Sequence, residues 1–213
     1  KQFTSPAEEP ENTILISTNE AQQEIIRVYE KYDWPLDIGV RTVGEEYNAS
    51  VLERDLLASR YRLEGFQLPD IQRLAQTRFV DTENRDFLTE VTNEVMALDP
   101  YFRAVVDSMD FFVQREDPSR VISMMRMLQA HTQMVRGLLL VTISSDGLPP
   151  GLRQEVAGIA DMVLEFKVRT IGTDFETSMT VTKFRNAPEN LRILVFRVTP
   201  EECITPETVE RIA

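Results

Sequence analysis

Short apolar runs alternate with amphipathic segments along most of the chain. The runs that predict buried strands lie at Thr13–Thr18, Arg78–Thr82, Arg103–Asp107, Leu138–Ile143 and Met162–Lys167. Between them, apolar residues recur every three or four positions, which predicts helices at about 19–34, 50–66, 84–99 and 118–136. Alternation of strand and helix is typical of an α/β fold with a mainly parallel central sheet that is flanked by helices.

Two further β-rich runs close the chain, at Ser178–Lys183 and Arg192–Val198. An Asn-containing turn at 186–190 separates them, so we expect an antiparallel hairpin that extends the central sheet. No repeat or clear linker interrupts the pattern, which favours a single domain over residues 1–213. The segment at about 40–76 fits the alternation least well, and we expect a helical insertion there.

The charge and cysteine content narrow the classes of partner and compartment. A net charge of −12 argues against a sequence-independent role on nucleic acid and against binding to an anionic membrane, because both need a basic surface. One cysteine, Cys203, excludes an internal disulfide, and this composition fits a reducing, cytoplasmic compartment. The longest apolar stretch, Gly137–Ile143, is too short to cross a bilayer.

Polar residues follow two of the predicted strands directly. The run Ala104–Val106 ends on Asp107 and Ser108, and the first strand ends on Asn19 and Glu20. In a parallel sheet the carboxyl ends of the strands face the ligand crevice, where an acid can hold a metal and its water beside a nucleotide. Each residue also has a structural interpretation. Asp107 can be a hydrogen-bonded acid at the end of a strand, and Glu20 can interact favourably with the dipole of the helix that follows.

The order of several stretches resembles the RecA-superfamily ATPase domain of the KaiC family. These stretches are "ILISTNEAQQEIIRVYEKYDWPL", "YFRAVVDSMDFF", "GLLLVTISSD" and a closing segment with the Lys-x-Arg motif Lys183-Phe184-Arg185. The resemblance covers most of the chain except roughly 40–76. It implies a RecA-like fold, with ATP and Mg²⁺ as cofactors and a homo-oligomer or a partner protein as the functional context.

The resemblance also implies roles for individual residues. Asp107 matches the acid that binds Mg²⁺ through water, and Glu20 matches an acid that orients the attacking water. By the same resemblance, Asn19 and Ser108 lie at the cofactor. The catalytic set is completed by two cations that reach the γ-phosphate of a neighbouring subunit, Lys183 and Arg185. The alternative for these cations is a solvated edge strand that carries charges.

Two departures from the family leave the activity open. The 213 residues contain no G-x-x-x-x-G-K-[ST] loop to hold phosphates, and we expect such a loop to fall immediately upstream of Lys1. Where the family has two adjacent glutamates, this chain has Asn19 and Glu20. The Asn side chain can bind a water molecule but cannot accept a proton from it. Two functions therefore remain: a nucleotide-binding regulatory domain that is a slow ATPase in an oligomer, and a non-catalytic protein-interaction or signalling module. A recombinase is disfavoured by the acidic charge.

Overall fold

A computed structural model describes residues 13–52, 85–144, 148–171, 174–187, 189, 193–199 and 203–206. The chain divides into two compact units. Among the described residues, the first unit holds 13–25 and 38–148 and contains a parallel sheet. The second unit holds 26–37 and the chain from 149 onward, and it contains an antiparallel sheet.

The parallel sheet has the strand order β2-β1-β3-β4. Its strands are β1 (Thr13–Ser17), β2 (Gly39–Thr42), β3 (Arg103–Asp107) and β4 (Leu138–Val141), all parallel to their neighbours. In the register of the two central strands, Ser17 lies opposite Asp107, so β1 and β3 end level with each other. Ile16 and Val106 are fully buried, as expected for central parallel strands.

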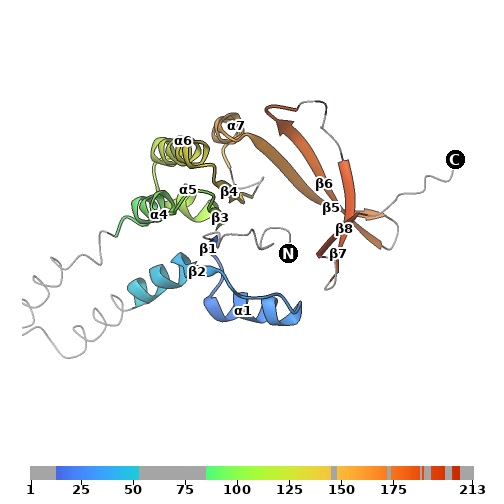
Figure 1. Cartoon of the computed structure of the whole chain (residues 1–213), viewed down its shortest axis with the longest axis horizontal. Coiled ribbons are helices and arrows are strands. Elements are labelled where there is room, and N and C mark those ends of the chain that lie inside the picture. The colour runs from blue at the N-terminus through green and yellow to red at the C-terminus, as the bar shows by residue number, and fades with distance from the viewer. Residues whose placement is uncertain are drawn as a thin grey trace, which may run out of the picture. The chain divides into compact units, whose positions relative to one another are not determined.

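Helices cover this sheet (Figure 1). In the first unit, residues 43–52 form a helix after β2, and α4 (Phe87–Met96) precedes β3. α1 (Gln22–Lys31) follows β1 in the chain, and its residues from Ile26 onward belong to the second unit. α5 (Asp110–Arg115) and α6 (Pro118–Val135) follow β3, and α6 contacts α4, α5 and β4. Asp117 caps α6 by accepting a hydrogen bond from the Ser119 N–H at 2.8 Å. The buried residues between these helices include Val91, Val95 and Leu128.

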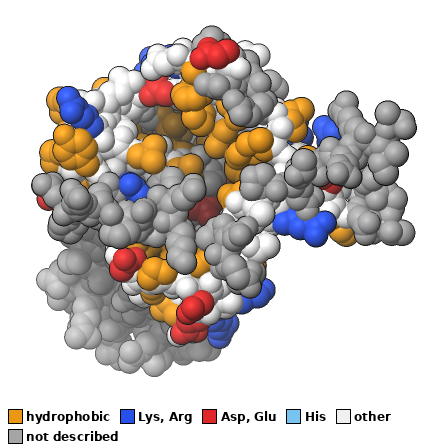
Figure 2. Space-filling model, turned by 45° about the vertical axis from the view of Figure 1, so that its right-hand side comes forward, with side chains coloured by type: hydrophobic (Ala, Val, Ile, Leu, Met, Phe, Trp, Pro, Cys, Tyr) orange, Lys and Arg blue, Asp and Glu red, His pale blue; other side chains and the backbone are white. Residues whose placement is uncertain are grey.

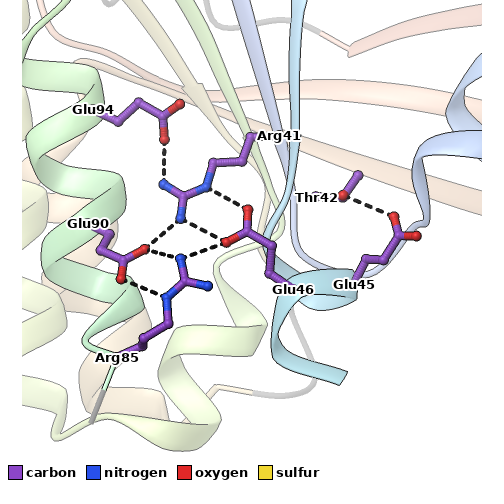
Figure 3. Close-up of polar contacts among 7 residues, drawn as sticks. All are labelled: Arg41, Thr42, Glu45, Glu46, Arg85, Glu90 and Glu94. Atoms are coloured by element: carbon purple, nitrogen blue, oxygen red, sulfur yellow. Dashed lines mark hydrogen bonds and ion pairs between the residues drawn. The ribbon is translucent and has the colours of Figure 1, made fainter. Parts of the chain in front are cut away.

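A network of five charged side chains joins β2, the helix at 43–52 and α4 (Figure 3). Arg41 on β2 pairs with Glu46 at 3.0 Å, Glu90 at 2.7 Å and Glu94 at 2.6 Å. Arg85 pairs with Glu46 at 2.8 Å and Glu90 at 2.6 Å. Hydrogen bonds from the guanidinium groups hold the pKa of Glu46, chiefly through Arg41, and of Glu90, chiefly through Arg85, below the ordinary range. The network therefore fixes a charged strand residue between two helices.

The second unit is built from α7 (Pro150–Ile159) and four consecutive antiparallel strands. The strands are β5 (Met162–Ile171), β6 (Asp174–Phe184), β7 (Ile193–Thr199) and β8 (Cys203–Pro206). Along β5 apolar and charged residues alternate, and Phe166 and Val168 remain 58% and 67% exposed. The face of the molecule drawn in Figure 2 shows hydrophobic side chains beside charged ones.

The predicted fold class is confirmed, with corrections in its strands. Helices flank a parallel sheet, and β6 and β7 form the predicted antiparallel hairpin. The expectation that Met162–Lys167 and the hairpin extend the central sheet was wrong, because β5 pairs with β6 in a separate antiparallel sheet. Three short elements were missed, namely β2, α5 and β8.

The remaining sequence expectations concern parts of the chain that are described incompletely. The predicted strand at Arg78–Thr82 lies outside the described residues. Of the segment at about 40–76, β2 takes the beginning, 43–52 is helical, and the rest lies outside the described residues. In the part of the chain that the structure describes, no helix is both long and apolar enough to cross a membrane.

Candidate functional site

The polar residues after β1 and β3 are bound directly to each other. The Thr18 hydroxyl accepts a hydrogen bond from the Ser108 N–H at 2.9 Å and donates one to the Ser108 carbonyl at 2.8 Å. The Thr18 N–H also donates to the Asp107 carbonyl at 2.7 Å. The parallel register brings these groups together at the carboxyl edge of the sheet, where ligands of open α/β sheets bind.

A pocket of about 230 Å³ opens at this edge and is called the edge pocket below. It is lined by Asn19, Asp107, Ser108, Asp110, Thr142, Ile143 and Ser144. The Asp107 carboxylate is exposed and accepts a hydrogen bond from the Thr142 hydroxyl at 2.5 Å. The Asn19 amide donates to the Ser108 hydroxyl at 3.2 Å. Three of the residues that the sequence indicated therefore lie in one pocket, together with three polar residues that it did not indicate.

Asp110 and Ser144 also line the edge pocket and are hydrogen-bonded to each other. The Asp110 carboxylate accepts hydrogen bonds from the Ser144 N–H at 3.1 Å and from the Ser144 hydroxyl at 3.1 Å. Asp110 begins α5, so its negative charge is favourable at the helix N-terminus. These residues were missed, although a signal was present. Thr142 and Ser144 follow the apolar run of β4 just as Asp107 follows the run of β3.

The oxygen donors of the edge pocket suit Mg²⁺. This ion takes hard oxygen ligands, keeps several waters, and is usually held by one or two carboxylates together with substrate phosphates. Asp107 and Asp110 supply two carboxylates to one open pocket, with hydroxyl groups beside them. Among the described residues, no group of three or more His, Cys, Asp and Glu side chains could hold a metal by itself. The pocket therefore fits an ion that shares its coordination with water and a ligand.

Glu20 lies just outside the edge pocket. Its main-chain N–H donates to the Ser17 hydroxyl at 3.1 Å, its side chain is exposed, and it does not contribute to the lining. Asn19, the residue before Glu20, lines the pocket instead. An amide can orient a water molecule there, but it cannot remove a proton from it.

The two cations of the Lys-x-Arg motif bind the C-terminus of α7. Lys183 Nζ donates to the Ala157 carbonyl at 2.7 Å and to the Gly158 carbonyl at 2.8 Å. Arg185 donates to the Ile159 carbonyl at 3.1 Å. The last carbonyls of a helix lack partners within the helix and carry the negative end of its dipole, so both cations stabilise α7. The structure thus gives both residues a structural contact within the second unit.

Comparison with known proteins places the chain in a family. It belongs to the family described as "Family of unknown function (DUF7125)", whose model matches residues 60–199. None of the curated proteins matches the chain.

Two solved structures resemble the chain over most of its length. The flagellar accessory protein FlaH from Methanocaldococcus jannaschii is 15% identical with a TM-score of 0.61. The KaiC-like protein PH0186 from Pyrococcus horikoshii is also 15% identical, with a TM-score of 0.56. Each alignment covers 93% of this chain and 77% of the other. At this identity the likeness establishes the fold alone, which is a RecA-like α/β fold shared with these two proteins.

Proposed function

We propose that this KaiC-like domain is a nucleotide-binding regulatory domain that holds Mg²⁺ and ATP at the edge pocket. The observation that carries the proposal is the meeting of Asp107 and Asp110 in one open pocket at the carboxyl ends of parallel strands. Asp107 would hold the ion through water, with Asn19 and Ser108 beside the nucleotide. The bound ion would supply positive charge that offsets the charge of the phosphates.

Hydrolysis by this arrangement would be slow. Asn19 cannot act as a base, and Glu20 would have to turn inward from outside the lining to orient water. A faster reaction would also need cations beside the phosphates. We propose that Lys183 and Arg185 supply them across a subunit boundary in a cytoplasmic oligomer. Lys183 would then have to leave the two carbonyls of α7 that it binds here, and Arg185 would have to leave the Ile159 carbonyl and the Asp161 carboxylate.

A second candidate is a non-catalytic interaction or signalling module with the same fold. The engagement of both cations by α7 and the exposed position of Glu20 favour this candidate. In such a module the domain would keep its fold. The edge pocket would then either bind a nucleotide without hydrolysing it or bind no nucleotide. The two candidates differ in whether Mg²⁺ and ATP bind together and whether ATP is consumed.

Calorimetric titration of Mg²⁺–ATP into the wild type and Asp107→Asn tests the proposal. We expect wild-type binding that depends on Mg²⁺ and at least about tenfold weaker binding by the variant, because a charge-assisted contact to the hydrated ion is lost. Asp37→Asn, which removes an exposed carboxylate elsewhere, is the matched control and should bind like the wild type. Equal affinity of the wild type and Asp107→Asn would contradict the proposed site. Absence of binding by the wild type would favour the interaction module.

A further inference from the structure

A second pocket, also of about 230 Å³, lies beside the edge pocket in the same unit and is called the Arg115 pocket below. Asn19 and Asp110 line both pockets, so the two share a wall. Thr18 also lines the second pocket, and the remaining polar lining comes from two helices: Tyr47 and Asn48 from the helix at 43–52, and Gln114 and Arg115 from α5. The function proposed above does not use this second pocket.

The guanidinium group of Arg115 is held in place before any ligand arrives. Its central carbon lies 4.1 Å from the ring centroid of Phe111 and 4.7 Å from that of Tyr47, and the two rings meet edge to face at 5.4 Å. One nitrogen, Nη1, donates to the Phe111 carbonyl at 3.2 Å. A side chain fixed in this way loses little further conformational freedom when it binds a ligand.

The positive charge of Arg115 has no anionic partner in the described part of the chain. The other pocket-lining charge is Asp110, whose carboxylate already accepts hydrogen bonds from Ser144. Arg41 and Arg85, by contrast, are surrounded by glutamates in the same unit. In a chain with a net charge of −12, an ordered guanidinium that lines a pocket and forms no ion pair with a described carboxylate is available to an anionic ligand.

The lining favours a carboxylate over a phosphate. A planar carboxylate matches the fork of a single guanidinium, whereas a phosphate with two charges is better met by several cations. Among the described residues that line it, the Arg115 pocket has no lysine and no second arginine, and Asp110 would repel the larger charge. Asn48 and Gln114 each offer both a donor and an acceptor, which suits an amide or a second polar group of the ligand.

We propose that the Arg115 pocket binds a carboxylate-bearing ligand, with Arg115 on the carboxylate and Asn48 and Gln114 on the adjoining polar groups. The carboxylate could belong to a free small dicarboxylate or to an acidic side chain of a peptide. Binding at this pocket requires neither Mg²⁺ nor a nucleotide, so the proposal stands independently of the function proposed above.

Titrations of the ¹⁵N-labelled 213-residue chain, followed by ¹H–¹⁵N NMR without Mg²⁺ or nucleotide, test this proposal. One titration uses sodium glutarate and another uses the blocked tripeptide acetyl-Ala-Glu-Ala-amide. We expect saturable shifts at Tyr47, Asn48, Gln114 and Arg115 with at least one of them. A response to glutarate alone identifies the free carboxylate as the source, and a response to the tripeptide identifies the peptide.

Arg115→Met keeps the apolar stem on the rings and should weaken binding about tenfold, because the charge-assisted contact is lost. Arg126→Met removes an exposed arginine of α6 and should bind like the wild type. If Arg115→Met does not fold, Arg115→Lys replaces it and should also bind more weakly, because lysine lacks the planar fork. The absence of saturable shifts, undiminished binding by the Arg115 variants, or equal binding of sodium phosphate would overturn the proposal.

Discussion

Replacing Arg41 with methionine should strongly destabilise the parallel-sheet unit. Methionine keeps most of the apolar stem and removes the charge that neutralises Glu46, Glu90 and Glu94 (Figure 3). Of the described cations in this network, Arg85 alone then remains, and it pairs with two of the three carboxylates, Glu46 and Glu90. The perturbation therefore tests whether the network holds β2 against the helix at 43–52 and α4.

The expected loss of unfolding free energy in Arg41→Met lies between the values that are typical of exposed and of buried ion pairs. Two unit charges 4 Å apart attract by about 4 kcal/mol at an effective dielectric constant of about 20, but desolvation offsets much of this. Removing one partner of a buried pair costs about 3–5 kcal/mol, and an exposed pair contributes about 0–1 kcal/mol. The Arg41 side chain is 16% exposed and its partners are 30–34% exposed. We therefore expect the free energy of unfolding to fall by about 2 kcal/mol at pH 7.

The pH dependence gives a sharper test of the same network. The folded-state pKa values of Glu46 and Glu90 are lowered, so their stabilisation is present above the unfolded-state pKa of about 4.3 and is lost as the pH falls through the folded-state values. In Arg41→Met these pKa values should rise. The difference between wild type and variant should therefore shrink as the pH is lowered below about 4.3.

Urea unfolding followed by circular dichroism between pH 3 and pH 8 measures both quantities. Arg126→Met is the matched control, and its unfolding free energy should stay within about 0.5 kcal/mol of the wild type, as is usual for surface substitutions. A loss in Arg41→Met no larger than in this control would refute the reasoning. So would a loss that stays constant from neutral to acidic pH.

Three other substitutions probe separate contacts. Gly44→Ala should destabilise the chain by more than about 3 kcal/mol in urea unfolding, because a Cβ there would lie 2.0 Å from the Thr18 carbonyl oxygen; Gly151→Ala, with open space around its Cβ, should not. Lys183→Ala should lower the thermal midpoint and cost about 1 kcal/mol, because two carbonyls of α7 lose their donor; an unchanged midpoint would contradict this. His131→Leu should leave the unfolding free energy unchanged or raise it, because the buried Nε2 has no hydrogen-bond partner among the described residues; a loss above about 1 kcal/mol would contradict this.

The sequence was most informative where the hydrophobic pattern was long and regular. α4, α6 and the apolar runs of β1, β3 and β4 could be recognised from periodicity alone. β2 could not, because it has four residues and includes Arg41, whose charge is neutralised by Glu46 nearby and by two glutamates of α4 that are distant in the sequence. β5 did carry a usable signal. Its alternation of apolar residues with charged residues is typical of a strand in an antiparallel sheet with one solvated face, rather than of a buried parallel strand.

The edge pocket was partly predictable for a related reason. Parallel strands bring their carboxyl ends to one edge, so Asn19, Asp107 and Ser108 could be expected to meet there. The sequence alone could not show that Glu20 lies outside the lining, because neighbouring residues after a strand can turn either way. The contact of Lys183 with α7 was also hidden, since it depends on how a strand packs against a helix about 25 residues earlier in the chain.

The pair of hydrogen bonds that Thr18 makes with Ser108 also limits which residue types can replace Thr18 during evolution. One hydroxyl serves both the N–H and the carbonyl of Ser108, so the contact depends on that oxygen and not on the size of the side chain. Valine has nearly the same shape as threonine, yet it would leave two main-chain groups without partners at a buried strand end. Among relatives that keep this junction, position 18 should alternate between threonine and serine and exclude valine.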